Sequence, residues 1–132
     1  MQYMLIIALD ENGPGPVEGE PGFDEGRQAW TDFTRELMES GVLVSGASLQ
    51  PTTVATTVRV AAGSATVTDG PFAESKEQLA GYYLVDVADL DAALAWAKKI
   101  PLPAGSIEVR PVSMMPDATG TPQVVGADAV GG

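Results

Sequence analysis

Runs of apolar residues divide the chain into predicted strands. Residues 3–9 are continuously apolar and rich in β-formers, which predicts a strand covered on both faces or lying at a dimer contact. Residues 53–61 instead alternate, with Val54, Val58 and Val60 on one side, which predicts a half-exposed strand. The predicted strands, in order, are residues 3–9, 42–49, 53–61, 65–68, 81–87 and 106–112. A Gly-Ser turn joins the third to the fourth, so we expect these two to form a hairpin.

A first helix is predicted where apolar residues recur at the spacing of an amphipathic helix. Trp30, Phe33 and Leu37 stand at i, i+3 and i+7, with charged residues largely between them. We expect Asp24 to cap the start of this helix and Gly41 its end.

A second helix is predicted after Asp89, which can serve as its N-cap, and it should stop at Pro101. Its apolar face consists of Leu90, Ala93, Leu94, Ala97 and Ile100. Between the hairpin and the strand at 81–87, residues 72–78 predict a short helix or a turn.

Two segments show no periodicity. Residues 10–22 are dense in Gly, Pro and acidic residues, which predicts a surface loop. Residues 116–132 are rich in Gly, Ala and Thr, which predicts a flexible C-terminal tail. The chain should therefore consist of one domain, residues 1–115, followed by this tail.

The order of the elements is strand–helix–strand, a hairpin, then strand–helix–strand, which predicts an α+β fold of the ferredoxin-like kind with an antiparallel sheet. Both helices can cover the same face of that sheet, and the opposite face is then left open. The strands at 3–9 and 81–87 carry enough apolar residues to fill both faces. We therefore expect a homodimer in which two sheets meet face to face or edge to edge.

Composition excludes several classes of function. The 132 residues include 7 basic and 18 acidic residues, and the net charge of −11 would repel nucleic acid and anionic membranes. Cysteine is absent, which excludes disulfides, zinc–thiolate sites and thiol catalysis. Histidine is also absent, so any acid–base chemistry must use carboxylates, Lys, Arg, Tyr or hydroxyls.

The N-terminal apolar run has no basic segment before it and no small-residue cleavage site after it, so it predicts a buried strand rather than a signal peptide. No apolar stretch approaches the roughly 20 residues that a membrane span needs. We expect a cytoplasmic protein.

A longer motif occupies residues 69–83, which read DGPFAESKEQLAGYY. This run resembles the signature of the DGPF-type proteins, which belong to the YCII-related group. The similarity extends to MQYMLIIAL, GVLVSGASLQP, TTVRV, DLDAALAWAKKIP and GSIEVRPV, so it covers nearly everything except residues 10–22 and the tail.

The resemblance implies a ferredoxin-like fold of the dimeric α/β-barrel type, and it implies no particular reaction. In the wider YCII-related group, enzymatic activity was proposed because many members carry a His and Asp pair in a cleft. This chain departs from that pattern because it contains no histidine.

Asp69 is the first candidate for chemistry. It could present a carboxylate at the mouth of a cleft, with Lys76 or Arg59 nearby to hold it ionised or to bind an anionic group of a substrate. The alternative is that Asp69, Gly70 and Pro71 only shape a turn, in which the aspartate accepts backbone N–H bonds.

The neighbours of Asp69 supply further candidates. Glu74, Lys76 and Glu77 lie within about one turn and could work together, or they could form a solvated surface. Tyr82 and Tyr83 are consecutive in a strand and must point to opposite faces, so that one is core and the other can reach a ligand. The candidate catalytic residues are Asp69 and Lys76, and the candidate ligand-binding residues are Arg59, Phe72, Glu74, Tyr82 and Tyr83.

Two further groups are weaker candidates. Trp30 and Phe33 could floor an apolar pocket, although aromatic residues at helical spacing more often belong to the core. The acids Glu18, Glu20, Asp24 and Glu25 lack the ordered spacing of a calcium loop, so we expect no metal, and the sequence suggests no cofactor.

Three hypotheses of function remain open. The first is a small-molecule-binding or accessory domain, since binding needs shape and a few polar anchors but no group that titrates near pH 7. The second is a lyase or isomerase in which Asp69, made more basic by burial, acts as general base and Lys76 or Arg59 stabilises negative charge. The third is a structural dimer that serves a protein partner.

Overall fold

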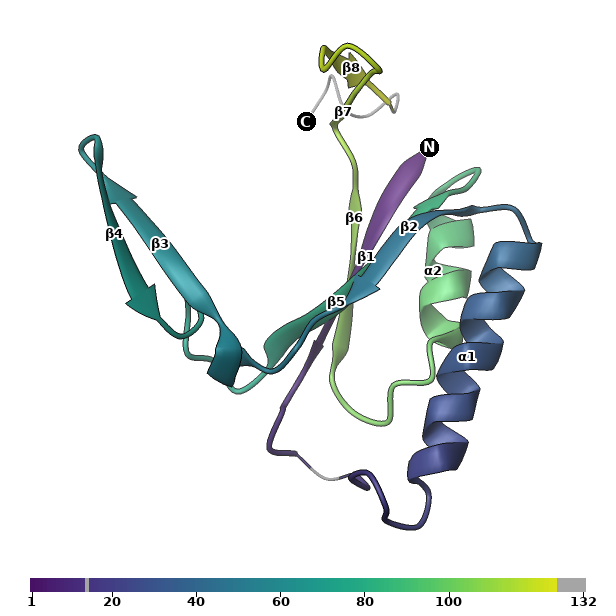
Figure 1. The fold of residues 1–132 in the computed structure, drawn as a ribbon. Helices are drawn as coiled ribbons and strands as arrows, with labels where there is room; N and C mark the ends of the chain where they lie inside the picture. Colours follow the sequence, from purple (N-terminus) through teal and green to yellow (C-terminus); the bar gives the residue numbers. More distant parts are fainter. Residues whose placement is uncertain (14, 126–132) are drawn as a thin grey trace.

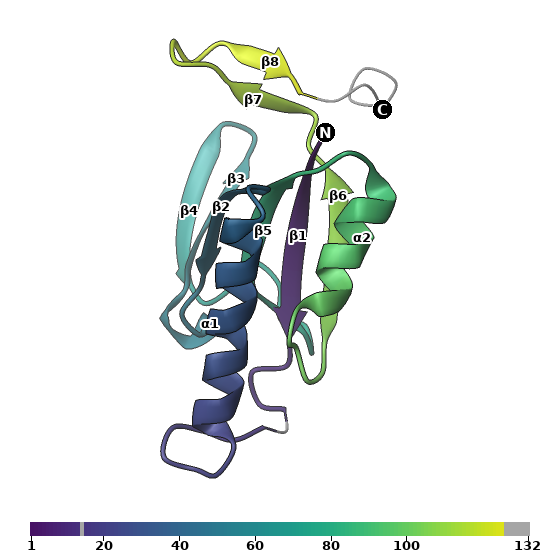
Figure 2. The same ribbon diagram turned by 90° about the vertical axis from the view of Figure 1, so that its right-hand side faces the viewer.

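Two helices cover one face of a four-stranded antiparallel sheet in the computed structural model, which describes residues 1–13 and 15–125 (Figures 1 and 2). The sheet has the strand order β2-β5-β1-β6. Its elements are β1 (Gln2–Leu9), α1 (Phe23–Glu39), β2 (Leu43–Ser48), β5 (Gln78–Asp86), α2 (Leu90–Lys99) and β6 (Ser106–Pro111). None of the helices in this described part of the chain is long and apolar enough to cross a membrane.

The topology follows the predicted order of elements. β1 and β2 both run antiparallel to β5, which lies between them, and α1 connects the two. β5 and β6 likewise both run antiparallel to β1, and α2 connects them. These are the two interleaved strand–helix–strand units of the ferredoxin-like arrangement. The predicted α+β class with an antiparallel sheet is confirmed.

The core lies between the sheet and the two helices. Tyr3, Leu5 and Ile7 alternate along β1 and are buried, as the pleat of a strand requires for residues that share a face. Phe33 and Leu37 of α1 pack into the same cluster. From α2 and the strand that precedes it come Val85, Val87, Ala93, Ala97 and Ile100.

The helix ends test the predicted caps. Asp89 is confirmed as the N-cap of α2, because its carboxylate accepts a hydrogen bond from the Ala92 backbone N–H at 2.9 Å. Asp24 is not the N-cap of α1. The helix begins at Phe23, and Gly22 occupies the cap position with a φ of 90°, a left-handed conformation that glycine adopts without strain.

The predicted hairpin is confirmed as a separate two-stranded sheet of β3 (Thr56–Ala61) and β4 (Ser64–Asp69). Positive φ angles at Ala62 and Gly63 turn the chain between the strands. The strand starts later than predicted, because residues Thr52–Val54 form a 3-10 helix, η1. The prediction of a half-exposed strand is wrong, since Val58 and Val60 are both exposed.

Residues 72–77 form bends without a helix before β5 begins at Gln78. After β6 the chain forms a small hairpin of β7 (Met114–Pro116) and β8 (Pro122–Val124). The sequence pattern had assigned β8 to the tail and did not predict this pairing. Residues 126–132, the remainder of that segment, lie outside the described residues.

Candidate functional site

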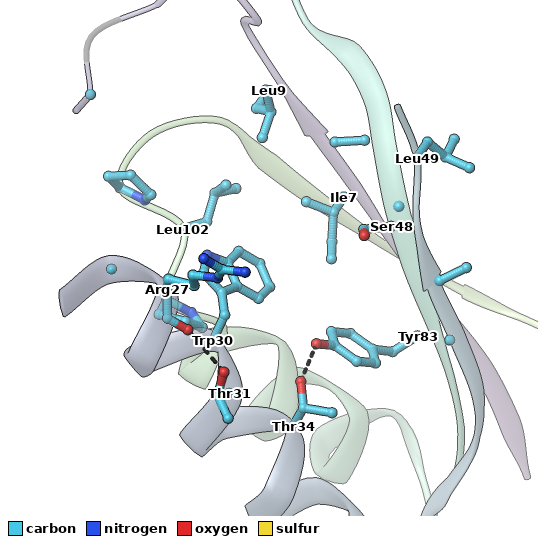
Figure 3. A pocket seen from close by; sticks show the side chains of 18 of the residues that line it. Ile7, Leu9, Arg27, Trp30, Thr31, Thr34, Ser48, Leu49, Tyr83 and Leu102 are labelled. Atoms are coloured by element: carbon cyan, nitrogen blue, oxygen red, sulfur yellow. Dashed lines mark hydrogen bonds between the residues drawn. The ribbon is translucent and has the colours of Figure 1, made fainter. Parts of the chain in front are cut away.

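A large open pocket lies between α1 and the helix-facing side of the sheet (Figure 3). Its volume is about 1740 Å³. β1, β2 and β5 contribute one wall, α1 contributes the other, and the segment Pro101–Pro103 closes one end.

Small residues on the strands create this space. Gly46 and Ser48 of β2 pair with Tyr83 and Gly81 of β5, so that three of these four neighbouring positions carry little or no side chain. Gly81 cannot be larger, because a Cβ atom at this position would lie 2.6 Å from the Ala47 carbonyl oxygen. Where neighbouring positions have such small side chains, the gap between sheet and helix stays unfilled.

Tyr83 and Thr34 mark the boundary between the pocket and the core. The Tyr83 hydroxyl lies 2.6 Å from Thr34 Oγ1, a hydrogen bond in which either group can donate. The Tyr83 ring also packs edge-on against Phe33, with ring centroids 5.5 Å apart. These two contacts hold the phenol in one orientation at the pocket wall (Figure 3).

The rest of the wall is mainly apolar. Trp30 of α1 and Leu102 lie across the cavity from Ser48 and Leu49, and Ile7 and Leu9 of β1 extend the apolar surface between them (Figure 3). Trp30 is only partly buried, whereas Phe33 is in the core. Of the two aromatic residues considered as a pocket floor, one thus lines the pocket and the other packs behind it.

Charged groups stand at the rim. Arg27 is exposed one turn before Trp30, and among the described residues its guanidinium makes no ion pair or hydrogen bond. Glu11 is engaged, since its carboxylate accepts hydrogen bonds from the Thr52 backbone N–H at 2.9 Å and from the Thr52 hydroxyl at 2.9 Å. This contact ties the end of β1 to η1.

The DGPF motif lies elsewhere, where the β3–β4 hairpin returns to the sheet. A smaller cavity of about 460 Å³ is lined there by Pro71, Phe72, Ala73, Ser75, Glu77 and part of β3. Asp69 ends β4 and is exposed, and Phe72, Glu74 and Lys76 are exposed as well. The general-base hypothesis for Asp69 requires a buried carboxylate. In the single chain Asp69 is exposed, so this requirement is not met.

The Arg59 and Thr57 side chains form hydrogen bonds with backbone carbonyls and not with the other candidate side chains. The Arg59 guanidinium donates to the Phe72 carbonyl at 3.1 Å, and the Thr57 hydroxyl donates to the Gly70 carbonyl at 2.6 Å. Within the described chain, Asp69 forms an ion pair with neither Arg59 nor Lys76. These contacts anchor the turn through the Gly70 and Phe72 carbonyls, whereas among the described residues the Asp69 carboxylate accepts none of the backbone N–H bonds that the alternative interpretation expected.

The two tyrosines point to opposite faces of the sheet. Tyr83 faces the helices and lines the pocket, whereas the side chain of Tyr82 pairs across the strands with Ile6 and Ala47 on the open face. The predicted candidates are therefore spread over three places: the pocket, the open face and the hairpin base. Sequence reasoning missed Thr34, Ser48, Leu49 and Leu102, which the fold brings to the pocket from three separate segments.

Comparison with known proteins identifies the family. Residues 1–116 match the YCII-related domain, which is most of the chain. The chain belongs to the YCII-related family. Among the relatives of this YCII-related protein is the uncharacterized protein R00369 of Rhizobium meliloti (strain 1021), which is 49% identical over 120 residues, covering 86% of this chain and 94% of the relative.

Proposed function

We propose that this YCII-related protein binds a small, mainly apolar molecule in the pocket between α1 and the sheet. The observation that carries the proposal is the pocket itself, which combines apolar walls with a few fixed polar groups, the usual construction of a ligand site. Its volume of about 1740 Å³ exceeds the roughly 300–1,000 Å³ of most ligand pockets because it is open along α1.

The hydroxyl pair gives the ligand a polar anchor. Thr34 and Tyr83 share one hydrogen bond, so the accepting hydroxyl still has its own proton to donate. A ligand with a carbonyl or ether oxygen at this end and an apolar body against Trp30 and Leu102 would match both features. Binding of this kind requires neither histidine nor cysteine, and the chain has neither.

The same proposal includes a homodimer formed through the open face of the sheet. Met4 pairs with Leu84, and Ile6 with Tyr82, in the middle of that face, and both helices of the described residues lie on the other side of the sheet (Figure 1). A sheet with apolar residues on both faces needs a layer on each side, and a second copy provides the missing layer. The two sheets would then form the dimeric α/β-barrel type of assembly.

The binding proposal is tested with N-phenyl-1-naphthylamine, a neutral apolar probe that becomes fluorescent when it leaves water. Wild-type protein should bind it saturably. Ser48→Trp should weaken binding at least tenfold, because the indole would fill the cavity from the exposed edge strand β2. Ala95→Trp adds the same side chain on the exposed side of α2, away from the pocket, and should leave binding unchanged.

The two halves of the proposal fail separately. Equal probe binding by the Ser48→Trp variant and the wild type would remove the pocket as the site. A monomer at micromolar concentration, measured by light scattering, would remove the dimer and leave the pocket untouched.

A further inference from the structure

The β3–β4 hairpin has one apolar and one polar face. Val58 pairs with Val67 and Val60 pairs with Ala65, so these four side chains share a face. The valines are 59%, 67% and 73% exposed at positions 58, 67 and 60 respectively. The opposite face carries Thr57, Arg59, Thr66 and Thr68. An amphipathic hairpin of this pattern is built to cover an apolar surface.

Among residues 1–13 and 15–125, none covers that apolar face, and its valines are exposed. β3 and β4 pair with each other and, in the described part of the chain, with no other strand. A two-stranded hairpin is at best marginally stable in water by itself. The valine face therefore lacks the layer that would stabilise it.

The base of the hairpin is firmly held, which fixes the direction in which it projects. The Gly70 backbone N–H donates to the Ala55 carbonyl at 2.8 Å, and the Thr57 and Arg59 side chains bond to the carbonyls of Gly70 and Phe72. Both views place the hairpin on the side of the sheet away from the helices, where the open face lies (Figures 1 and 2).

We propose that the β3–β4 hairpin is a dimerisation arm whose valine face packs against a second copy of this chain. The inference rests on the homodimer of the proposed function and adds its second contact. In a twofold dimer each copy offers an arm and receives one, so the contact occurs twice.

Charge favours a second copy as the occupant. A chain with a net charge of −11 repels its own copies, so two copies approach most easily where acidic residues are few or are paired with a basic residue. Of the 18 acidic residues in the chain, the hairpin contains one, Asp69, which lies at its base opposite Thr56. On the open sheet face, Met4, Ile6 and Leu84 are uncharged, and the neighbouring Glu108 of β6 is paired with Arg110, so this part of the face carries no net charge.

The arms alone bury too little area for a stable dimer, so the contact between the two sheets is also needed. A strand of six residues is about 20 Å long and two strands are about 10 Å wide, so one hairpin face covers about 200 Å². Two arms and the surfaces beneath them bury about 800 Å², which is below the roughly 1,200 Å² of a stable interface. The sheet-to-sheet contact must supply the remainder.

The test compares two double variants that add the same charge to opposite faces of the hairpin. Val58→Asp with Val67→Asp should raise the dimer dissociation constant at least tenfold in sedimentation equilibrium. Thr66→Asp with Thr68→Asp should change it less than threefold. Val58→Thr with Val67→Thr keeps the β-branched side chains and should also weaken the dimer, which separates lost contact from a hairpin that fails to form.

Each result decides the matter. Equal dissociation constants for the valine variants and the wild type would overturn the arm while leaving the sheet-mediated dimer. Equal weakening by the valine and threonine pairs would show charge repulsion alone and would overturn it too. A monomeric wild type would overturn arm and dimer together, whereas probe binding in the α1 pocket is measured independently.

Hydrogen exchange gives a second readout on the unmodified chain. Backbone amides of residues 56–69 should exchange slowly above the dimer dissociation constant and quickly below it, because only the dimer covers the hairpin. Exchange that does not depend on protein concentration would overturn the proposal.

Discussion

Gly81→Ala should destabilise the protein through the close approach of β5 to β2. The added Cβ would lie 2.6 Å from the Ala47 carbonyl oxygen and 3.1 Å from Ser48 Cα, both of which are backbone atoms. The strands must part by at least 0.4 Å before the first contact reaches 3.0 Å. Forcing extra volume into a packed site costs typically about 1–3 kcal/mol, and we expect about 2 kcal/mol here.

Gly26→Ala is the matched control, because the same substitution there should have the opposite sign. Gly26 lies inside α1, and a Cβ atom at this position meets nothing within 4 Å. Replacing an exposed helical glycine with alanine stabilises by up to about 1 kcal/mol. With roughly 4 °C per kcal/mol for a domain of this size, the melting temperature should fall by about 8 °C in Gly81→Ala and rise by about 2–4 °C in Gly26→Ala.

The measurement is differential scanning calorimetry at one fixed protein concentration, since self-association would make the melting temperature depend on concentration. A Gly81→Ala variant that melts within 2 °C of the wild type would refute the reasoning, because it would show that β2 can yield without cost. A Gly26→Ala variant that melts below the wild type would also refute the reasoning, because a glycine-to-alanine change in an open helical position should stabilise.

Three further changes test other parts of the structure. Leu37→Ala removes a fully buried side chain of α1 and should cost about 2–5 kcal/mol in urea unfolding, whereas a cost below 1 kcal/mol would contradict its place in the core. Asp89→Ala removes the N-cap of α2 and should cost about 1 kcal/mol, with Asp91→Ala, one residue into the helix, as the control that should cost less. Hydrogen bonds from the Thr119 hydroxyl and backbone N–H and from the Thr121 N–H lower the pKa of Asp117, so the turn between β7 and β8 should keep its full stability above about pH 3.9 and lose it as the pH falls through the lowered value. A carbon-13 NMR titration of the Asp117 carboxyl group with a midpoint at or above the ordinary value would contradict this.

The sheet and helices were predictable because their cause is local. The continuous apolar run of residues 3–9 marks a strand, and the helical spacing of Phe33 and Leu37 records which face of α1 meets the core. The N-cap of α1 was not predictable in this way. Asp24 has the right chemistry, but the left-handed turn at Gly22 starts the helix one residue earlier and leaves Asp24 within its first turn.

The pocket could not be predicted, because it results from small side chains that meet only in the folded sheet. Gly46, Ser48 and Gly81 become neighbours through the register of β2 with β5, which includes an irregularity between Leu43 and Ser45. A shift of one residue would turn each of them to the other face. Sequence spacing carries no information about that register.

Around the DGPF motif, the sequence suggested a site that the structure does not assemble. Asp69, Glu74 and Lys76 are close in sequence and chemically suited to cooperate, yet the chain between them is irregular and exposed. Charged residues that are close in sequence meet when a helix sets their spacing, and no helix forms here.

In the proposed dimer, strand β5 would separate the ligand pocket from the second copy of the chain. Its Tyr83 contributes a hydroxyl to the cavity, while the very next residue back, Tyr82, belongs to the surface on which the second copy should rest. Ligand binding and the dimer contact would therefore involve adjacent residues of the same strand. If the occupied cavity alters the strength of pairing, thermodynamic linkage requires that pairing alter the affinity of the cavity by the same factor.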